Sequence, residues 1–441
     1  MNPSLGHALR ITNSACVAFV GAGGKSTALF MLARELPPPV IVTATTHLGV
    51  WQTSLADLHI GTDDHNPPGQ LDPEFQGVIL ITGTVEGDRT KPVNKKLLTW
   101  LYEFCRSHSI SLLIEADGSR QKPLKAWADH EPPIPGFADQ VVQVVGMAGL
   151  GKPLTDEYVH RADIFSELSG LKIGETITNE GLIKVLTHKD GGLKNIPPDA
   201  IRIVLLNQAD EPESQAATRG LTDSLLSSFR SVVVASLQDK IIRAVREPVA
   251  GIVLAAGESS RFGKPKQVLK WKGDFFVRVV AQTAIRAGLS PVIVVTGAHA
   301  GEVESAVREL GVILKHNNQW KDGQGSSIRE GISSIPKENG AAIFLLADQP
   351  QINTSVLQAL REKHAERLYP IIAPMVIDRR ANPVLFDRVT FPDLMNIEGD
   401  TGGRAIFHKH RVEYLPWHDD SLLLDVDTPE QYERLISNED L

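Results

Sequence analysis

Short apolar runs alternate with amphipathic stretches along the first half of the chain. The runs predict buried strands at residues 17–20, 40–42, 78–81, 112–114, 141–145, 201–206 and 232–235. Helices are expected at 27–36 and 95–107, a polar loop at 61–70, and an irregular proline-rich loop at 121–136. Strands that alternate with helices are typical of a mainly parallel sheet covered by helices.

The same alternation starts again after a charged segment at 236–248, which is expected to contain a short helix and to link two domains. Beyond it, strands are expected at 249–254, 292–295 and 342–346, and helices at 276–287, 302–310 and 354–364. The predicted fold class is therefore α/β, with domains at 1–245 and 246–441. Each domain is expected to hold a mainly parallel sheet flanked by helices, P-loop-like in the first and Rossmann-like in the second.

Composition narrows the class of protein. The 441 residues carry a formal net charge of −8, which argues against a nucleic-acid partner, because such surfaces need an excess of basic residues. The only cysteines, Cys16 and Cys105, form no CxxC pair, so neither a disulfide framework nor a zinc ribbon is expected. We find no secretory signal and no apolar run of about 18 residues, and we expect a cytoplasmic protein that does not span a membrane.

Residues 254–266 of the second domain read LAAGESSRFGKPK and follow an expected strand. Small residues leave backbone N–H groups exposed, and Arg261 and Lys266 add positive charge beside them, which together suit a triphosphate. A turn with a solvated basic face is the alternative. Residues 318–329, NQWKDGQGSSIR, either cap a helix or present donors to a phosphate. The predicted nucleotide-binding residues are Leu254, Ala255, Ala256, Gly257, Ser259, Lys266, Ser326 and Ser327.

Carboxylates stand near the ends of expected strands in this domain. Asp348 follows an apolar run, and a carboxylate at a strand end can hold Mg²⁺ beside a triphosphate; helix capping is the alternative. Asp425 and Asp427 would share one face at strand spacing. Thr428 and Gln431, just after them, have the spacing of a capping box, which does not account for the two aspartates.

The pattern L-A-A-G-x-S-x-R-x-G-x-x-K resembles the signature loop of the MobA-like nucleotidyltransferases, most closely that of the molybdenum cofactor cytidylyltransferases. The resemblance covers about residues 249–437. Phe262 stands where the family usually has Met, and Ala256 where the guanylyltransferases more often have Gly, which favours CTP. The resemblance implies that Asp348 and Asp427 bind Mg²⁺, and that Arg261 and Lys266 stabilise phosphate charge in the transition state.

The same resemblance implies a binding site for the second substrate, built from an Asn-Pro turn and a Gly-Asp-x-Gly-Gly-Arg segment. The implied substrate-binding residues are Asn382, Asp400, Gly402, Gly403 and Arg404. Ala381 replaces the glycine that precedes Asn382 in the family. In the implied reaction, the terminal phosphate of molybdopterin attacks the α-phosphorus of CTP, and pyrophosphate leaves.

The first domain has its own candidate phosphate site between a strand and a helix. Residues 20–27 read VGAGGKST, which supplies backbone N–H groups, a lysine and a hydroxyl at a helix N-terminus. Phe19 stands where a full Walker A motif has glycine, so the loop is shortened; a tight turn with a solvated lysine is the alternative. The predicted phosphate-binding residues are Gly21, Gly23, Gly24, Lys25, Ser26, Thr27 and Asp117.

This loop, together with EADGS at 115–119, KPLK at 122–125 and VHR at 159–161, resembles the selenium-dependent hydroxylase accessory protein family. The resemblance implies nucleotide binding and a role beside a molybdenum hydroxylase apoprotein. Residues 207–210, NQAD, loosely resemble the Asn-Lys-x-Asp guanine motif, but Gln replaces Lys, so guanine specificity is not expected.

The sequence therefore predicts a molybdenum cofactor cytidylyltransferase fused to an accessory domain, with Mg²⁺ as cofactor and with CTP and molybdopterin as substrates. One alternative is a nucleotidyltransferase that uses GTP or another acceptor, such as a sugar or alcohol phosphate. A second is a maturation chaperone that binds the cofactor without turnover.

Overall fold

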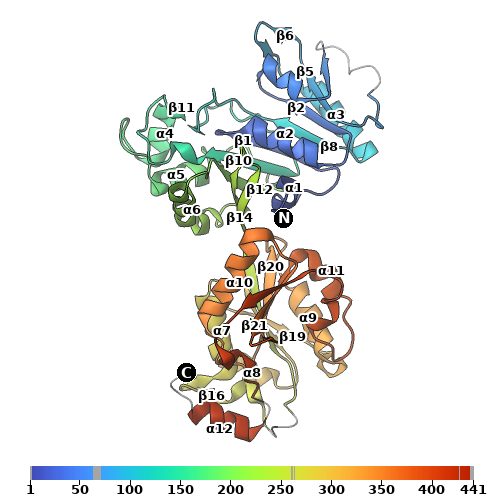
Figure 1. Cartoon of the computed structure of the whole chain (residues 1–441), viewed down its shortest axis with the longest axis vertical. Helices are drawn as coiled ribbons and strands as arrows, with labels where there is room; N and C mark the ends of the chain where they lie inside the picture. Colours follow the sequence, from blue (N-terminus) through green and yellow to red (C-terminus); the bar gives the residue numbers. More distant parts are fainter. Residues whose placement is uncertain (1, 63–70, 260–261, 263, 427, 438–441) are drawn as a thin grey trace. The chain divides into compact units, whose positions relative to one another are not determined.

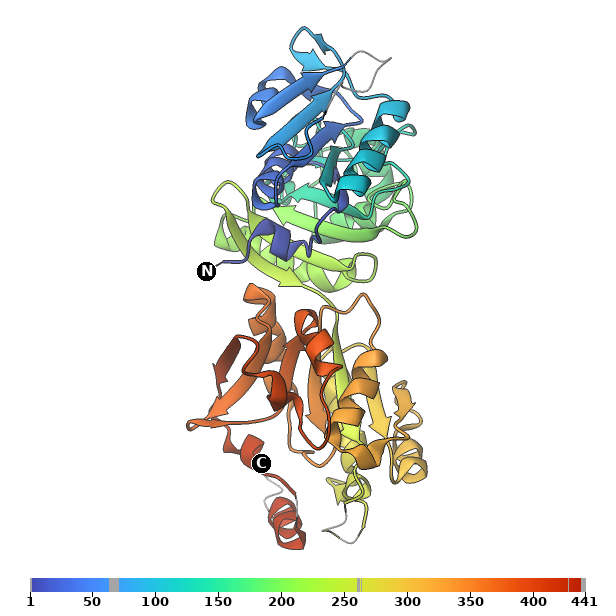
Figure 2. The same ribbon diagram turned by 90° about the vertical axis from the view of Figure 1, so that its right-hand side faces the viewer.

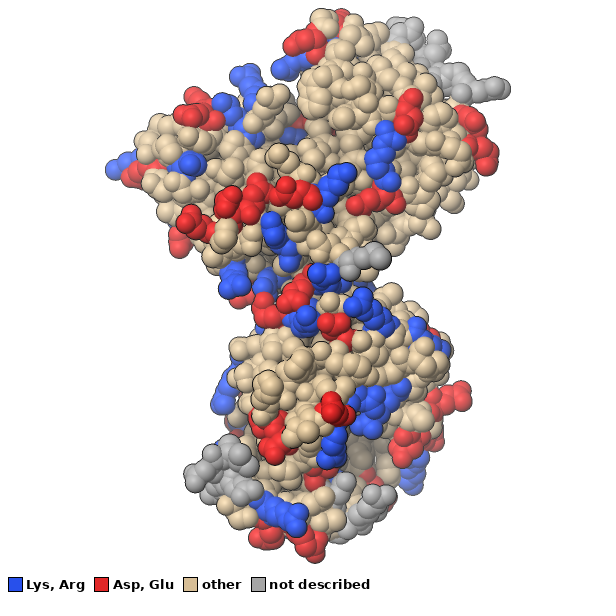
Figure 3. Space-filling view, viewed as in Figure 1, with Lys and Arg blue, Asp and Glu red and all other residues tan. Residues whose placement is uncertain are grey.

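The computed structural model describes residues 2–62, 71–259, 262, 264–426 and 428–437. The chain divides into two compact units, Met1–Arg246 and Glu247–Leu441, and each holds a central sheet with helices packed on it (Figure 1). Within the described ranges, no helix is both long and apolar enough to cross a membrane. On the face seen in Figure 3, acidic and basic side chains are interspersed over each unit. Neither sign of charge dominates this face of either unit.

The first unit is built on a nine-stranded sheet. From edge to edge its strands are β14 (Ile241–Arg246), β13 (Ser231–Ser236), β12 (Ile201–Asn207), β10 (Gln140–Gly146), β1 (Cys16–Gly21), β8 (Ser111–Glu115), β2 (Val40–Ala44), β5 (Val78–Thr82) and β4 (Leu58–Gly61). All neighbours pair in parallel except β14, which runs antiparallel to β13. The central strands β1 and β10 are buried along their whole length, as expected when helices cover a parallel sheet.

Helices of the first unit pack on this sheet. They are α1 (Leu5–Ala8), α2 (Lys25–Glu35), α3 (Lys95–His108), α4 (Ala162–Ser169), α5 (Asn179–Thr187) and α6 (Pro212–Leu225). Short strands lie outside the main sheet, namely β9 (Leu124–Lys125) with β11 (Val159–His160), and β3 (Leu48–Gly49) with β7 (Arg89–Thr90) and β6 (Val85–Glu86). Cys16 and Cys105 are free thiols in the apolar cluster under α3, and burial raises the pKa of Cys105 to about 12. Both cysteines therefore act as packing residues.

The second unit contains an eight-stranded mixed sheet. Its strands are β19 (Ile313–His316), β18 (Val292–Thr296), β15 (Val249–Ala255), β20 (Ala341–Leu346), β23 (Val384–Asp387), β21 (Ile371–Val376) and β22 (Arg379–Arg380), with β24 (Val412–Pro416) paired to β21. The strands from β19 to β20 are parallel, whereas β23 is antiparallel to both of its neighbours. A separate hairpin joins β16 (Lys270–Trp271) and β17 (Asp274–Phe275).

Helices cover both faces of the second sheet (Figures 1 and 2). They are α7 (Phe276–Arg286), α8 (Ala300–Val307), α9 (Gln324–Ser333), α10 (Thr354–Arg367), α11 (Phe391–Leu394) and α12 (Pro429–Ser437). Val253 packs in one cluster with α7, α8 and α10, while its neighbour Ile252 packs in another with α9 and α11. Because successive residues of a strand point to opposite faces, the two helix sets lie on opposite sides of the sheet.

The structure confirms the predicted α/β class with mainly parallel sheets, and it corrects the prediction at two places. The short helix expected after residue 235 is wrong, because β14 occupies that segment. Lys240 adopts φ 56° in a turn, and the chain then pairs with β13 and buries Ile242 and Val245. Asp425 and Val426 do not form a strand, so the prediction that Asp425 lies on a strand face is also wrong. Asp427, the other residue of that prediction, lies outside the described residues.

We predict that Asp387→Ala destabilises the second unit by about 3 kcal/mol, because it leaves a buried ring nitrogen of His364 without its hydrogen-bond partner. Asp387 at the end of β23 lies 2.7 Å from Nε2 of His364 on α10, and both residues are almost fully buried. Asp393→Ala is the matched control, because it removes a 2.8 Å contact to His410 nearer the surface. Calorimetric unfolding of the full chain measures both, and equal shifts for the two variants would contradict the prediction.

Candidate functional site

In the second unit, β15 and β20 end at a cavity of about 820 Å³. Neighbouring parallel strands bring their carboxyl ends to one edge of a sheet, where α/β proteins bind ligands. The residues predicted to bind nucleotide that line this cavity are Leu254, Ala256, Gly257, Ser259, Lys266 and Ser327. Ala255 lies inside β15 and is buried. The chain at Ala256, just after β15, lies close to Gly297, because a Cβ on Gly297 would be 2.6 Å from the Ala256 carbonyl oxygen.

Ser259 organises the loop after β15. It adopts φ 58°, and its Oγ accepts a hydrogen bond from the Lys266 N–H at 3.1 Å while it donates to Gln267 Oε1 at 3.2 Å. The Gln267 amide in turn donates to the Gly257 carbonyl oxygen at 2.7 Å. These bonds fix the two ends of the loop. The predicted catalytic residue Arg261 lies outside the described residues.

An ion pair joins Lys266, which follows the loop after β15, to Asp348, which follows β20. Lys266 Nζ donates to Asp348 Oδ2 at 2.8 Å, and the two side chains are 13% and 27% exposed. Both line the cavity, so an ammonium and a carboxylate are presented together to whatever occupies it. The structure thus brings together two of the predicted catalytic residues.

Residues 320–324 form another part of the cavity wall. They lie in the stretch 318–329 that the sequence analysis gave as a possible phosphate contact, but only Ser326 and Ser327 of that stretch were predicted as binding residues. Lys321 Nζ lies 5.4 Å from the centre of the Trp320 ring, and both line the cavity with Asp322, Gly323 and Gln324. Gly323 has φ +94°, and a Cβ there would lie 2.5 Å from the Asp400 N atom. Gly323 therefore has no room for a side chain where residues 320–324 meet residues 399–400. This glycine is the feature of the sequence that could have indicated the contact.

Ser326 and Ser327 differ in role. Asn317 Nδ2 donates to both hydroxyls, at 2.8 Å to Ser326 and at 3.0 Å to Ser327. The Ser326 hydroxyl also contacts the carbonyl oxygens of Gln319 and Gly323, at 2.9 and 2.8 Å. Ser326 therefore holds the turn that begins α9, whereas Ser327 lines the cavity.

The predicted substrate residues are only partly gathered here. Asp400 lines the cavity, and its Oδ1 accepts from the Gln324 N–H at 3.4 Å. Gly402 lies against the same residue, because a Cβ there would be 2.6 Å from Gln324 Oε1. Gly403 packs on the Phe386 ring, and the exposed Arg404 lies near Arg380. The lining residues in the described part of the chain do not include Asn382, Gly403 or Arg404.

The second predicted metal ligand, Asp427, lies outside the described residues. Its neighbour Asp425 accepts from Gln349 Nε2 at 2.6 Å, which places it close to the segment of Asp348. The predicted capping box is confirmed, since the Thr428 N–H donates to Gln431 Oε1 and the Gln431 N–H to Thr428 Oγ1. The described residues contain no group of three or more His, Cys, Asp or Glu side chains placed to hold a metal ion.

In the first unit, the loop between β1 and α2 makes most of its bonds within the protein. Gly21 has φ +96°, and a Cβ there would lie 2.2 Å from the Val144 carbonyl oxygen. The N–H groups of Gly21, Ala22 and Gly23 donate to Asp117, Val144 and Lys122, respectively. The donors left for an anion are those of the first turn of α2, which have no partner inside the helix.

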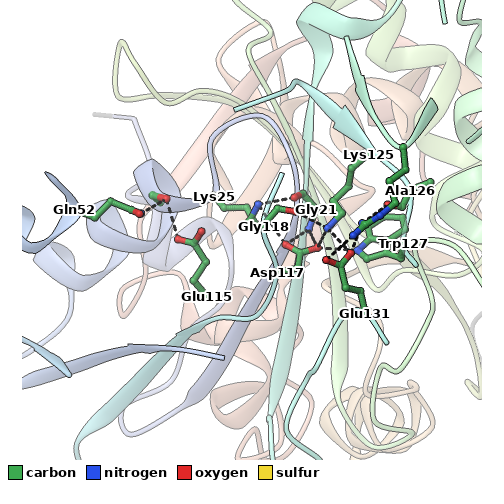
Figure 4. Close-up of polar contacts among 12 residues, drawn as sticks. Gly21, Lys25, Gln52, Glu115, Asp117, Gly118, Lys125, Ala126, Trp127 and Glu131 are labelled. Atoms are coloured by element: carbon green, nitrogen blue, oxygen red, sulfur yellow. Dashed lines mark hydrogen bonds and ion pairs between the residues drawn. The ribbon is translucent and has the colours of Figure 1, made fainter. Parts of the chain in front are cut away.

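Asp117 is the centre of a buried charge cluster beside this loop (Figure 4). It lies 3.3 Å from Lys25 Nζ and 3.0 Å from Lys125 Nζ, and it accepts from the indole N–H of Trp127 at 2.8 Å. Lys25 also donates to the Gly21 carbonyl oxygen at 2.6 Å. Asp117 therefore ties the loop, the lysine of α2 and the strand β9 together.

Glu131 and Arg161 complete this cluster. Lys125 contacts Glu131 at 3.1 Å, and Arg161 Nη2 donates to the other carboxylate oxygen at 3.0 Å. Burial acts to raise the pKa of Glu131, but hydrogen bonding by Arg161 and the charge of Lys125 outweigh it, so the pKa lies below its usual range. Burial and the same two cations lower the pKa of His160 to about 4. Glu131 is thus ionised and His160 neutral near pH 7.

Ser26 contacts a second carboxylate. Its Oγ donates to Glu115 Oε2 at 2.9 Å and accepts from Gln52 Nε2 at 2.6 Å (Figure 4). Burial raises the pKa of Glu115, against the opposing effects of Lys25 and Ser26. The predicted residue Thr27 is exposed on α2. The sequence prediction placed Asp117 in the phosphate site, yet the carboxylate that contacts the helix hydroxyl is Glu115.

Two protein-family models match the chain. The model described as YqeC protein matches residues 17–163, and the model described as MobA-like NTP transferase domain matches residues 251–414. The "Uncharacterized protein YqeC" of Escherichia coli is 30% identical over 216 residues, which cover 47% of this chain and 82% of that protein.

Two further relatives have names that state an activity. The "Nicotine blue oxidoreductase" of Paenarthrobacter nicotinovorans is 29% identical over 197 residues, 43% of this chain and 96% of that protein. The "Probable molybdenum cofactor guanylyltransferase" of a Geobacillus strain is 25% identical over 199 residues, 43% of this chain and 98% of that protein. Taken with the family matches, these similarities show that the chain belongs to the YqeC family through its first unit and carries a MobA-like NTP transferase domain in its second.

Proposed function

We propose that the second unit transfers a cytidylyl group from CTP to the terminal phosphate of molybdopterin. The observation that carries the proposal is the Lys266–Asp348 pair at the strand-end cavity, 2.8 Å apart and accessible from it. In this reaction a phosphate oxygen of the acceptor forms a bond to the α-phosphorus, and the bond from that phosphorus to the pyrophosphate oxygen breaks. A phosphate oxygen is already a nucleophile, so the site needs no separate general base.

Lys266 has the chemistry to stabilise this step. A fixed ammonium beside the transferred phosphorus offsets the charge that builds up on the phosphate oxygens and on the leaving pyrophosphate. Asp348 holds the ammonium at the cavity wall, and Arg261 is proposed to act beside it. The ring of Trp320 and the backbone at Ala256 and Gly257 offer surfaces for the base and the phosphates.

Asp348 also fits a role as an Mg²⁺ ligand. Mg²⁺ at nucleotide sites is held by one or two carboxylates together with substrate phosphates and water, so a single partly exposed carboxylate in the cavity meets the requirement. Asp427 is proposed as the second ligand. Bound Mg²⁺ would supply charge neutralisation for the phosphates, and the ion pair with Lys266 would keep Asp348 at the cavity wall.

The nucleotide and the acceptor are open to alternatives. Ala256 favours CTP only through the family resemblance, and the Geobacillus relative is named for guanylyl transfer. A sugar or alcohol phosphate is a second possible acceptor, and a chaperone that binds the cofactor without turnover is a different class of function. Pyrophosphate release with each of the four NTPs, with and without molybdopterin, separates these possibilities, because a chaperone releases none.

For the first unit we propose binding of a purine nucleotide in support of molybdenum hydroxylase maturation, with a hydroxylase apoprotein as partner. The N-terminus of α2 and Lys25 support a phosphate site, and Ser26 with Glu115 supports a place for a phosphate-bound cation. A phosphate has to compete with Asp117 for Lys25. Asp117 stays neutralised in that exchange, because Lys125 and Trp127 also hold it.

Lys266→Ala is expected to lower cytidylyl transfer by about 10²–10³-fold, the usual loss for one electrostatic stabiliser. Lys409→Ala is the control, because it removes a second 2.8 Å Lys–Asp contact, to Asp393, away from the cavity. The rate of pyrophosphate release with CTP and molybdopterin measures both variants. Equal rates for the two variants would remove Lys266 from the mechanism.

Asp348→Asn is expected to abolish most transfer and to raise the Mg²⁺ concentration needed for half-maximal rate, because an amide is a poorer Mg²⁺ ligand than a carboxylate. Asp393→Asn, at the same distance from a lysine, is expected to leave the Mg²⁺ dependence unchanged. A titration of rate against Mg²⁺ gives both values. Wild-type rates for Asp348→Asn at saturating Mg²⁺ would contradict the metal assignment.

The fragment 247–441 is expected to fold and to transfer cytidylate without the first unit, because it is a compact unit with its own sheet and its own cavity. Circular dichroism and the pyrophosphate assay test the two parts of this expectation. A folded but inactive fragment would mean that the first unit contributes to the transfer site.

A further inference from the structure

The second unit contains another cavity, of about 530 Å³, apart from the one proposed for cytidylyl transfer, which is called the transfer cavity below. This second cavity is bordered by α7, the β16–β17 hairpin, residues 350–354, residues of the segment 419–424, and Leu435 of α12. In the described part of the chain, no residue lines both cavities. The volume of the second cavity is in the usual range for small-molecule sites, and the proposed transfer reaction uses none of its lining residues.

Part of the wall of the second cavity is apolar. The residues that form this part are Trp271, Val279, Pro350, Ile352, Leu424 and Leu435. Such a surface favours the body of an organic molecule, because covering it removes apolar area from water. A small inorganic ion would leave the same surface uncovered.

Two buried residues of the wall each carry a polar atom that lacks a partner. Trp271 is 8% exposed and Gln351 is 9% exposed, and both line the second cavity. The indole Nε1–H of Trp271 and the Oε1 of Gln351 make no hydrogen bond among the described residues. The amide nitrogen of Gln351 donates to the carbonyl oxygens of Ser421 and Leu424, at 3.2 and 2.7 Å, which fixes this side chain. A buried donor or acceptor without a partner costs free energy, and a ligand with matching groups removes that cost.

The charged side chains at the second cavity favour an anion. Arg286, the last residue of α7, is exposed and has no ion-pair or hydrogen-bond partner among the described residues. The two carboxylates of the wall are already engaged, since Asp274 lies 3.2 Å from Arg278 Nε and Asp419 accepts from a backbone N–H at 2.9 Å. A guanidinium without a partner is a strong donor to a carboxylate, sulfonate or phosphate group.

The same two chain segments border both cavities. One runs from Lys266 in the transfer cavity to Trp271 in the second cavity, and the other runs from Asp348 to Gln351. Each segment is only a few residues long. A ligand held by Trp271 and Gln351 therefore acts on the segments that position the 2.8 Å ion pair between Lys266 and Asp348.

We propose that the second cavity binds an organic anion with an apolar body, and that its occupation alters nucleotide binding in the transfer cavity. Arg286 contacts the anionic group, Trp271 donates to an acceptor of the ligand, and Gln351 accepts from an N–H or O–H group. The effector role rests on the proposed function, because it needs a nucleotide in the transfer cavity. Binding of the anion does not depend on that function.

The first test compares two fluorescent probes in titrations of the full chain. Anilinonaphthalene sulfonate has an aromatic body, an N–H group and an anionic sulfonate, and phenylnaphthylamine lacks the sulfonate. Arg286→Ala should weaken the sulfonate probe by about tenfold and the uncharged probe by less than about twofold, because only the sulfonate makes a charged hydrogen bond. Arg367→Ala is the matched control, since Arg367 is likewise the last residue of a helix, α10, and is not among the described lining residues.

The second test removes the donor of Trp271 and keeps an aromatic ring. Trp271→Phe should weaken the sulfonate probe by about three- to tenfold, the scale of one hydrogen bond. Trp417→Phe is the matched control, because its Nε1 is also buried without a partner among the described residues, and Trp417 is not one of the described residues that line the second cavity. Thermal unfolding of both variants shows whether they fold. If Trp271→Phe does not fold, the comparison of Arg286→Ala with Arg367→Ala decides alone.

Equal binding of the sulfonate probe by Arg286→Ala and Arg367→Ala overturns the site. Complete displacement of the probe by saturating CTP also overturns it, because the probe then occupies the transfer cavity. We expect CTP and the probe to bind together, each changing the affinity of the other by the same factor, at least about threefold.

Joint binding without a mutual effect overturns the effector role and leaves the site in place. A chain that binds the probe as expected but releases no pyrophosphate with CTP and molybdopterin contradicts the proposed function and not the site. Normal pyrophosphate release without probe binding does the reverse, so the two failures are distinguishable.

Discussion

Parallel pairing of strands is the constraint on which both units depend. It brings the carboxyl ends of distant segments to one edge, so that β1, β8 and β12 share an edge in the first unit, and β15 and β20 in the second. Chain approaches at these edges leave no room for side chains. Gly23 shows this, because a Cβ there would lie 2.3 Å from the Gly146 Cα. Gly21, Gly23 and Gly24 of the loop after β1 are therefore requirements of packing, whatever ligand that loop binds.

The ionic pairs of the two units differ in how deeply they are buried. In the first, Asp117 and both of its lysine partners are almost fully buried, and the desolvation of these groups is offset only while they stay paired. In the second, Lys266 and Asp348 keep partial exposure at a large cavity. A ligand of the second unit meets its ionic pair directly. In the phosphate site proposed for the first unit, a phosphate would have to exchange with Asp117, which holds Lys25.

This difference bears on how each unit is used. A cavity of about 820 Å³ with an accessible ionic pair suits the binding of two substrates and the release of product. The first unit instead connects the loop after β1 to the ends of β12 and β13 through the two hydrogen bonds of Asn207.

The local sequence pattern determined the fold class, most of the strands and several residues of the candidate site. Apolar runs and glycine-containing loops predicted the parallel α/β class and most of the strands, because burial on both faces requires continuous apolar segments. The signature loop and the aspartate after β20 identified Lys266 and Asp348, which the fold brings to one cavity. The capping box at Thr428 was also readable, since its bonds lie within four residues.

Tertiary structure decided what depends on contacts between distant segments. The charged segment before Pro248 became β14 because the edge of β13 was open to pairing, which no local pattern reports. Ser326 was predicted to bind nucleotide, yet its hydroxyl is engaged by Asn317 and by the turn before α9. The Trp320–Gln324 wall and the bond between Asn207 and Gly23 depend on how strands order themselves in a sheet. Residue spacing along a strand determines which side chains share a face of the sheet. Which distant segment each side chain contacts depends on the order of the strands, and that order is fixed only when the sheet forms.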